Sequence, residues 1–115
     1  MLETKKLLIK HGINSDELIK LLNLRDEKKI DFLLVDVREE FEYKESHIKG
    51  VNMLKPTSSF NLWAKEIIDN YKEKVIIFTC RTDNRSGQVC KIFREYGLNV
   101  INHLGGIINY FGELE

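Results

Sequence analysis

The chain has 115 residues, of which 43% are hydrophobic and 31% charged, with 18 basic side chains balanced by 18 acidic ones. This length suits a single domain spanning residues 1–115, and the composition excludes a disordered chain. The balanced charge gives no electrostatic reason to expect nucleic acid or an anionic membrane as a partner. No apolar run reaches the about 20 residues that cross a bilayer.

The first half of the chain is predicted to alternate strands with helices. A helix is expected after Asn14, because Glu17 three residues later completes a capping box. Residues 30–37 form a compact apolar run, which is typical of a strand buried on both faces. The full series is a short strand or lead-in at 5–13, a helix at 14–29, the strand at 30–37, a short helix or turn at 38–50 and a short strand at 51–54.

The second half continues this alternation after Pro56, the only proline. Ser58 or Ser59 is expected to cap the next helix, and Gly97 to end the one that follows it. The elements are a helix at 57–74, a strand at 75–80, a helix at 86–97, a strand at 99–104 and a last helix at 107–114. Such an alternation predicts an α/β fold with a mostly parallel central sheet of about five strands and helices on both faces.

A cysteine stands where ligands bind in such sheets, at the carboxyl end of a strand. Cys80 follows an apolar strand and precedes a polar loop and a helix. Only the thiolate is a strong nucleophile, and the helix that begins near Asn84 directs its N–H groups and positive dipole end at the loop. The loop can turn its own N–H groups inward as an anion-binding nest, while Arg81 and Arg85 add positive charge. Cys80 is therefore predicted to be a nucleophile rather than a small buried hydrophobe.

Two chemistries fit a cysteine in such a loop: sulfur transfer through a persulfide and phosphoester hydrolysis through a phosphocysteine. A phosphate needs a wider ring of donors than one sulfur atom. Arg85 is the fifth residue after Cys80, which makes a tight ring, and no obvious general acid is present, although Asp83 can be proposed. Sulfur transfer is the preferred interpretation; a phosphatase or arsenate reductase is the less favoured one.

The other cysteine and the histidines give no sign of a second site. Cys90 lies in mid-helix and is expected to be part of the core. It is poorly placed to pair with Cys80, which favours reduced thiols and a cytoplasmic location, and no secretory signal is evident. No metal site is expected, because the cysteines lack zinc-type spacing and the three histidines are scattered: His11, His47 and His103.

Three segments in this order resemble the family of single-domain rhodaneses, which are sulfurtransferases. "LLVDVREEFEYKESHIKGVNML" is similar to the family's D-V-R and G-H-I-x-G-A motifs, with Ser46 in place of glycine and Val51 in place of alanine. "VIIFTCRTDNRS" is similar to the active loop C-R-x-G-N-R-S. "YGLNVINHLGGIINY" is similar to the family's ending, with Tyr110 where tryptophan is common. The resemblance extends over nearly the whole chain.

The resemblance implies a rhodanese-like three-layer sandwich. It also implies that Cys80 accepts a sulfane sulfur from a donor such as thiosulfate and passes it to cyanide or a thiol, and no cofactor is expected. Loop N–H groups would hold the sulfur and arginine side chains would steer anionic donors. The implied binding residues are Arg81, Thr82, Asp83, Asn84 and Arg85. The main alternative is a rhodanese-like module that carries or senses sulfur, or binds a partner, with little turnover.

Asp83 stands where the family has glycine. Glycine adopts positive φ angles readily, whereas aspartate does so at some energetic cost, and its carboxylate adds negative charge beside a site for anions. A pairing with Arg81 or Arg85 is one way to offset that charge. Slow turnover with thiosulfate is therefore expected, with a protein persulfide as a possible different donor.

Asp36 and Arg38 follow the buried strand that should lie near the active loop. They are expected to support the loop, mainly through a structural salt bridge, and Glu42 is a candidate partner of Arg38. His47 and His103 are expected to be structural, because transfer through a preformed thiolate needs no histidine base.

Overall fold

Five parallel strands form the centre of the fold in the computed structural model, which describes residues 2–115. Their order across the sheet is β1-β5-β4-β2-β3, and every neighbouring pair is parallel. The strands are β1 (Gly12–Ile13), β2 (Leu33–Asp36), β3 (Met53–Leu54), β4 (Val75–Thr79) and β5 (Asn99–His103). The predicted α/β class and parallel sheet are confirmed, and β4, which leads to Cys80, is the central strand.

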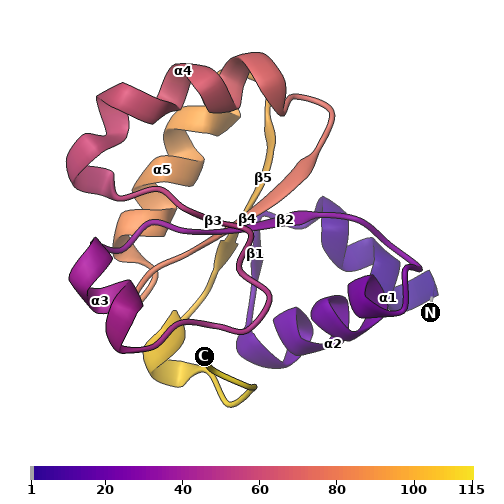
Figure 1. Ribbon diagram of the computed structural model, residues 1–115. Helices are drawn as coiled ribbons and strands as arrows, with labels where there is room; N and C mark the ends of the chain where they lie inside the picture. Colours follow the sequence, from indigo (N-terminus) through magenta and orange to yellow (C-terminus); the bar gives the residue numbers. More distant parts are fainter. Residues whose placement is uncertain (1) are drawn as a thin grey trace.

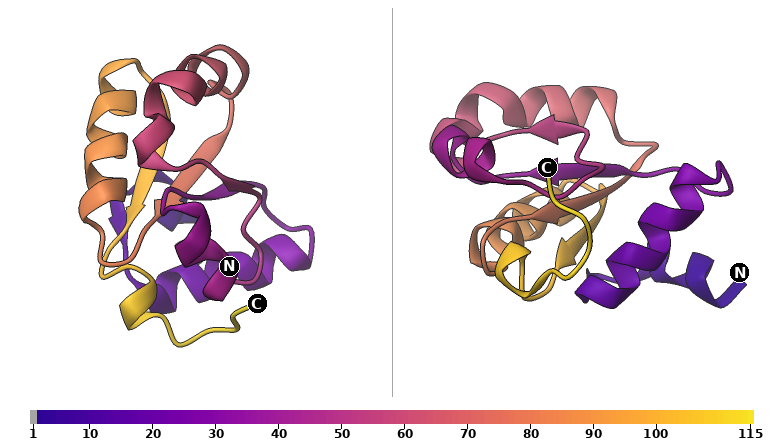
Figure 2. Two further views of the ribbon diagram at one scale, coloured as in Figure 1. Left: turned by 60° about the vertical axis from the view of Figure 1, so that its left-hand side comes forward. Right: turned by 60° about the horizontal axis from the view of Figure 1, so that its bottom comes forward.

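Helices cover both faces of the sheet and complete three layers (Figures 1 and 2). Helices α4 and α5 lie on one face, α2 lies on the other, and α3 lies beside the end of the sheet to which β2 and β4 lead. The α-helices are α1 (Leu2–Lys5), α2 (Ser15–Asp26), α3 (Glu40–Glu45), α4 (Phe60–Asn70) and α5 (Asn84–Glu95). Three 3-10 turns accompany them: η1 (Lys6–Ile9), η2 (Thr57–Ser59) and η3 (Ile107–Asn109). None of the helices described in residues 2–115 combines the length and apolar character required to span a bilayer.

Strand β4 separates two hydrophobic clusters because its successive side chains point to opposite faces. Phe78 packs with Phe93 of α5, their ring centroids 5.6 Å apart, in a cluster that also holds Trp63 of α4. The neighbouring Ile77 lies in the second cluster, beside Leu18 and other leucines of α2. A strand covered on both sides needs apolar residues at every position, which explains the unbroken run in the sequence.

The predicted helix boundaries hold where local chemistry sets them. Asn14 accepts from the Glu17 N–H while the Glu17 carboxylate accepts from the Asn14 N–H, so the capping box is present. Gly97 follows α5 with φ +82°, a conformation that favours glycine. Ser59 precedes α4 as expected, but its hydroxyl donates to the Pro56 carbonyl instead of capping the helix.

Two predicted elements are only partly confirmed. Residues 5–13 were expected to form a strand or lead-in, yet only Gly12–Ile13 pairs with β5, and the preceding residues form α1 and η1. Leu7 and Leu8 in η1 pack against the second cluster, and a short apolar run of this kind is compatible with either a helical turn or a strand. The last helix predicted at 107–114 is only η3, because the following residues pair antiparallel with the segment around Ile48.

Candidate functional site

The parallel strands bring several polar side chains to one edge of the sheet. Asp36 ends β2, Cys80 follows β4 and His103 ends β5, so all three lie at the carboxyl edge. The backbone continues this pairing past the strands, since the Val37 N–H donates to the Thr79 carbonyl at 2.9 Å. This is the edge at which ligands bind in open parallel sheets.

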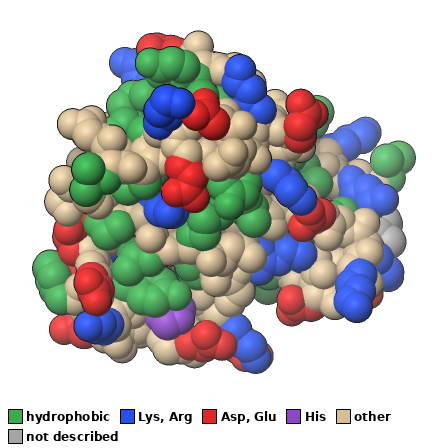
Figure 3. All heavy atoms as spheres, turned by 45° about the horizontal axis from the view of Figure 1, so that its top comes forward, with side chains coloured by type: hydrophobic (Ala, Val, Ile, Leu, Met, Phe, Trp, Pro, Cys, Tyr) green, Lys and Arg blue, Asp and Glu red, His purple; other side chains and the backbone are tan. Residues whose placement is uncertain are grey.

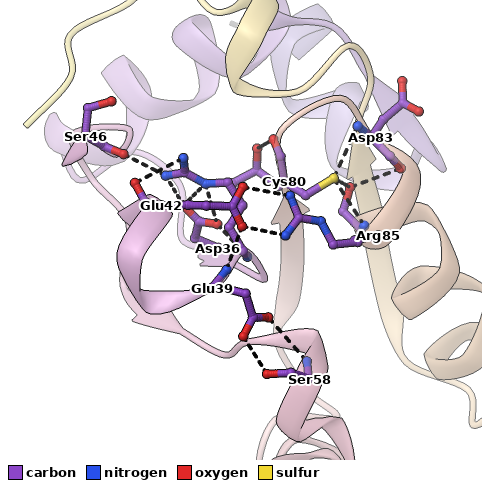
Figure 4. Close-up of polar contacts among 11 residues, drawn as sticks. Asp36, Glu39, Glu42, Ser46, Ser58, Cys80, Asp83 and Arg85 are labelled. Atoms are coloured by element: carbon purple, nitrogen blue, oxygen red, sulfur yellow. Dashed lines mark hydrogen bonds and ion pairs between the residues drawn. The ribbon is translucent and has the colours of Figure 1, made fainter. Parts of the chain in front are cut away.

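The Cys80 sulfur lies inside a small cup of hydrogen-bond donors (Figure 4). The N–H groups of Asp83 and Ser86 point at it, at 3.2 and 3.4 Å from nitrogen to Sγ, and the Ser86 hydroxyl oxygen is 3.2 Å away. Helix α5 begins at Asn84, so its positive end faces the same sulfur. Cys80 as a whole is only 1% exposed, so the residue is almost completely enclosed by protein.

Only part of the predicted binding set contacts the sulfur. Of the five loop residues from Arg81 to Arg85, Asp83 alone donates a hydrogen bond to Sγ. Ser86, which sequence reasoning did not include, contributes two of the three polar contacts. The sequence contained grounds for including Ser86, because this serine ends the loop motif and lies in the first turn of α5, where helical N–H groups are free.

Asp83 adopts a strained backbone conformation and is held from several sides. Its φ is +121°, in the region that favours glycine. Its carbonyl accepts from the Gly87 N–H at 2.8 Å and from the Asn102 amide at 3.3 Å. Its carboxylate accepts from the Gly105 N–H at 2.8 Å. The suggested pairing of Asp83 with Arg81 or Arg85 is therefore wrong: the carboxylate binds a backbone N–H across the loop instead.

The turn after β5 clamps the other side of the loop. The Ile107 and Ile108 N–H groups donate to the carbonyls of Cys80 and Arg81 at 2.9 and 3.1 Å. A Cβ on Gly106 would lie 2.4 Å from the Arg81 carbonyl oxygen, so only glycine allows this approach. The second glycine of the Gly105-Gly106 pair is thus required by contact with the active loop.

Arg85 binds Glu42 of α3 rather than standing free (Figure 4). Its two terminal nitrogens donate to the two carboxylate oxygens at 2.6 and 2.9 Å. The hydrogen bonds from Arg85 lower the pKa of Glu42 to about 2, and the same contact raises the pKa of Arg85. Glu42 was expected to pair with Arg38, which is wrong: Arg38 reaches only its carbonyl, at 3.5 Å.

Asp36 and Arg38 form the structural salt bridge that the sequence predicted. Arg38 donates to Asp36 through its side chain, at 2.8 Å from Nη2, and through its own backbone N–H at 2.9 Å. It also donates to the Ser46 carbonyl at 2.7 Å, which ties the end of α3 to β2. Both side chains are buried, as suits a structural pair, and Arg38 also forms part of the wall of a depression beside the loop.

The surface beside the loop is a depression of about 370 Å³. Arg81 is exposed there, next to two apolar side chains that reach solvent, Phe41 at 70% and Ile108 at 56% exposure. Its lining residues are Arg38, Phe41, Glu42, Glu45, Ser46, Arg81, Ile107 and Ile108. Among residues 2–115, no three His, Cys, Asp or Glu side chains gather as a metal site.

The remaining titratable groups lie away from the sulfur. Burial raises the pKa of Cys90 to about 12, so this thiol stays neutral and unreactive. His103 is buried between Ser15 and Thr79, with ring nitrogens 2.9 and 2.8 Å from the two hydroxyls. His47 stacks on Tyr43 and its Nδ1 lies 3.0 Å from the Tyr43 carbonyl. Both histidines have the structural roles that were expected.

Comparison with known proteins supports the resemblance noted in the sequence. The rhodanese-like domain family matches residues 17–113. A curated Bacillus subtilis protein named "Putative sulfurtransferase YtwF" is 33% identical over 84 residues, covering 72% of this chain and 77% of its own. The tRNA uridine(34) hydroxylase of Acinetobacter baylyi is 30% identical over 109 residues, covering 92% of this chain. The chain spans 33% of that hydroxylase's length, so it corresponds to one part of it.

Solved structures agree on the fold. A rhodanese-related protein from Thermoplasma volcanium superposes with a TM-score of 0.76 at 22% identity, covering 92% of this chain and 98% of its own. A rhodanese-like domain protein from Staphylococcus aureus gives a TM-score of 0.72 at 23% identity, covering 92% of this chain and 97% of its own.

Proposed function

Since the chain belongs to the family of rhodanese-like domains, we propose that it is a sulfurtransferase in which Cys80 carries a sulfane sulfur as a persulfide. The observation that carries the proposal is the pair of N–H groups, from Asp83 and Ser86, directed at the sulfur. Donors fixed in this way stabilise an anionic sulfur without having to reorganise during the reaction. The curated relative named as a sulfurtransferase supports the same reaction class.

The reaction has two displacement steps. With thiosulfate as donor, the Cys80 thiolate attacks the outer sulfur, the S–S bond of thiosulfate breaks, and sulfite leaves with the electron pair. A thiolate or cyanide then attacks the outer sulfur of the persulfide, which returns Cys80 as a thiolate. Neither step needs a metal, a cofactor or a histidine base.

The charges around the loop favour a donor other than thiosulfate. Three arginines lie near the loop: Arg38, Arg81 and Arg85. Carboxylates neutralise two of them, in the pairs Arg38–Asp36 and Arg85–Glu42. Asp83 adds a further negative charge, so Arg81 alone does not create a positive field for a dianion. We propose slow turnover with thiosulfate, and a thiol or persulfide carried on a protein as the better substrate.

The surface beside the loop is consistent with a substrate larger than thiosulfate. Phe41 and Ile108 expose apolar side chains into the depression next to Arg81, where a small anion would leave them in water. On the face that α4 covers, acidic and basic side chains are interspersed (Figure 3), which offers no continuous basic patch there for nucleic acid. A cytoplasmic location stays a prediction, supported by two cysteines that are both unpaired.

A partner-binding module with little turnover is the second candidate, and the burial of Cys80 is the observation that favours it. Intact-mass measurement after incubation with thiosulfate, and separately with a cysteine-persulfide protein, distinguishes the two. We expect one added sulfur atom that cyanide removes, absent in Cys80→Ser and retained in the matched control Cys90→Ser. A protein that takes up sulfur from neither donor, yet binds a partner, would favour the module, and hydrolysis of an aryl phosphate would instead indicate a phosphatase.

A further inference from the structure

The Ser86 hydroxyl has one proton to donate but lies within hydrogen-bond distance of three atoms. Its oxygen lies 3.2 Å from the Cys80 sulfur, 2.6 Å from Asn102 Oδ1 and 3.3 Å from the Asp83 carbonyl. Asn102 Oδ1 and the Asp83 carbonyl only accept hydrogen bonds, whereas a serine hydroxyl donates one. The shortest of these contacts, to Asn102, takes the proton.

The orientation of the Asn102 amide is set by a second contact. Its Nδ2 donates to the Asp83 carbonyl at 3.3 Å, so its oxygen must face Ser86. The backbone of Asn102 is fixed in β5, where its N–H donates to the His11 carbonyl at 2.9 Å. Gly87 leaves the space for this side chain, because a Cβ there would lie 3.1 Å from Asn102 Nδ2.

We propose that Asn102 is a positioning residue that turns the Ser86 hydroxyl away from the Cys80 sulfur and so withholds a third hydrogen-bond donor from the thiolate. With its proton on Asn102, Ser86 offers the sulfur a lone pair, which accepts from an S–H but repels an S⁻. An anionic sulfur keeps the two backbone N–H donors, and it gains the Ser86 hydroxyl only if that hydroxyl rotates and gives up Asn102.

This inference rests on the proposed role of Cys80 as the sulfur-carrying nucleophile, but its test needs no sulfur donor. Alkylation of Cys80 by iodoacetamide at neutral pH forms one S–C bond and releases iodide, at a rate that follows the thiolate. Asn102→Leu removes the nearer acceptor, so the Ser86 hydroxyl can donate to an anionic sulfur, which is a stronger acceptor than the neutral Asp83 carbonyl 3.3 Å away. One hydrogen bond to a charged group raises the population of the thiolate about tenfold. The more stable thiolate is a weaker nucleophile, which offsets part of this gain, so we expect the alkylation rate to rise about threefold.

The decisive measurement is the same substitution in a Ser86→Ala background. If Asn102→Leu raises the alkylation rate only when Ser86 is present, the proposal is supported. A rise of equal size in both backgrounds would show that loss of the Asn102–Asp83 bond merely loosens the loop, and no rise in either would also overturn it. Asn102→Asp, which keeps an acceptor for Ser86, should react no faster than the wild type. Should Asn102→Leu fail to fold, Asn102→Ala replaces it in the comparison with and without Ser86→Ala.

The readouts keep the two proposals separable. Mass spectrometry assigns the alkylated thiol, and buried Cys90 serves as the internal reference that should stay unmodified. The Asn102 effect can be present in a protein that never takes up sulfur, in which case only the proposed function fails. If the protein takes up sulfur but its alkylation rate does not depend on Ser86 and Asn102, the role of Asn102 is contradicted while the proposed function stands.

Discussion

At the scale of the residue, Asp83 combines a strained backbone with a useful side chain. Its φ of +121° is unfavourable for any residue but glycine, while its carboxylate accepts from the Gly105 N–H at 2.8 Å and ties the active loop to the turn after β5. Strain of this kind and a charged hydrogen bond are each worth about 1–3 kcal/mol, so they largely offset each other. The remaining effect of Asp83 on the site is therefore the negative charge that it places beside the sulfur.

Asp83→Gly is therefore expected to change the free energy of unfolding by less than about 2 kcal/mol and to raise kcat/KM for thiosulfate several-fold. The matched variant Asp83→Asn keeps an oxygen for the Gly105 N–H but removes the charge. If both variants gain equally, charge limits the wild type; if only the glycine variant gains, backbone strain does. Steady-state kinetics that are unchanged in both variants would contradict the prediction.

At the scale of the element, the Glu42–Arg85 pair joins α3 to the start of α5. The pKa of Glu42 is about 2, so the pair stays ionised throughout the neutral range. Glu42→Gln removes the compensating charge and leaves Arg85 able to attract an anion. We expect the KM for thiosulfate to fall about threefold to tenfold, with a gain that shrinks at high salt. Glu40→Gln, on the same helix but paired with Lys44, is the control that should leave KM unchanged.

His103 joins β5 to α2 and β4 through Ser15 and Thr79, and this connection is sensitive to pH. Burial lowers the pKa of His103 from 6.5 to about 4, with Asp83 opposing the shift. The unfolded chain therefore binds a proton that the folded protein does not, and stability is full above pH 6.5 and declines as the pH falls toward 4. The loss is on the order of 3 kcal/mol.

Urea denaturation at pH 7.0 and at about pH 5 measures this effect before the carboxylates titrate. His103→Gln, which cannot be protonated, should be less stable than the wild type at neutral pH but lose less on acidification. Equal losses in the two proteins between these pH values would show that another group is responsible.

At the scale of the whole molecule, one sheet supports two hydrophobic clusters, with Phe78 and Ile77 of β4 facing opposite sides. Truncation of either side chain to alanine leaves a cavity, and we expect each to lower the free energy of unfolding by about 2–5 kcal/mol. Because both clusters share β4, unfolding should remain a single transition. Trp63 fluorescence, which reports one cluster, should coincide with far-ultraviolet circular dichroism; separate transitions would mean that the two layers unfold independently.

Much of this architecture could be predicted from the sequence because it follows from short-range patterns. Buried runs such as 75–80, the capping box at Asn14 and the glycine after α5 are local features, and their alternation specifies a parallel sheet. The position of Cys80 between a strand and a helix N-terminus also followed, since both elements adjoin it in the chain. Where local signals were ambiguous, at 5–13 and 107–114, packing and strand pairing decided the outcome.

The partners within the site depended on the tertiary structure. Glu42 and Arg85 are 43 residues apart and meet because β2 lies next to β4 in the sheet. Asn102 reaches Ser86 because β5 lies on the other side of β4. By itself the sequence determined which cysteine is the candidate nucleophile and that donors surround it. The order of the strands decided which side chains share those donors and compensate those charges, because hydrogen bonds and ion pairs depend on proximity in space rather than along the chain.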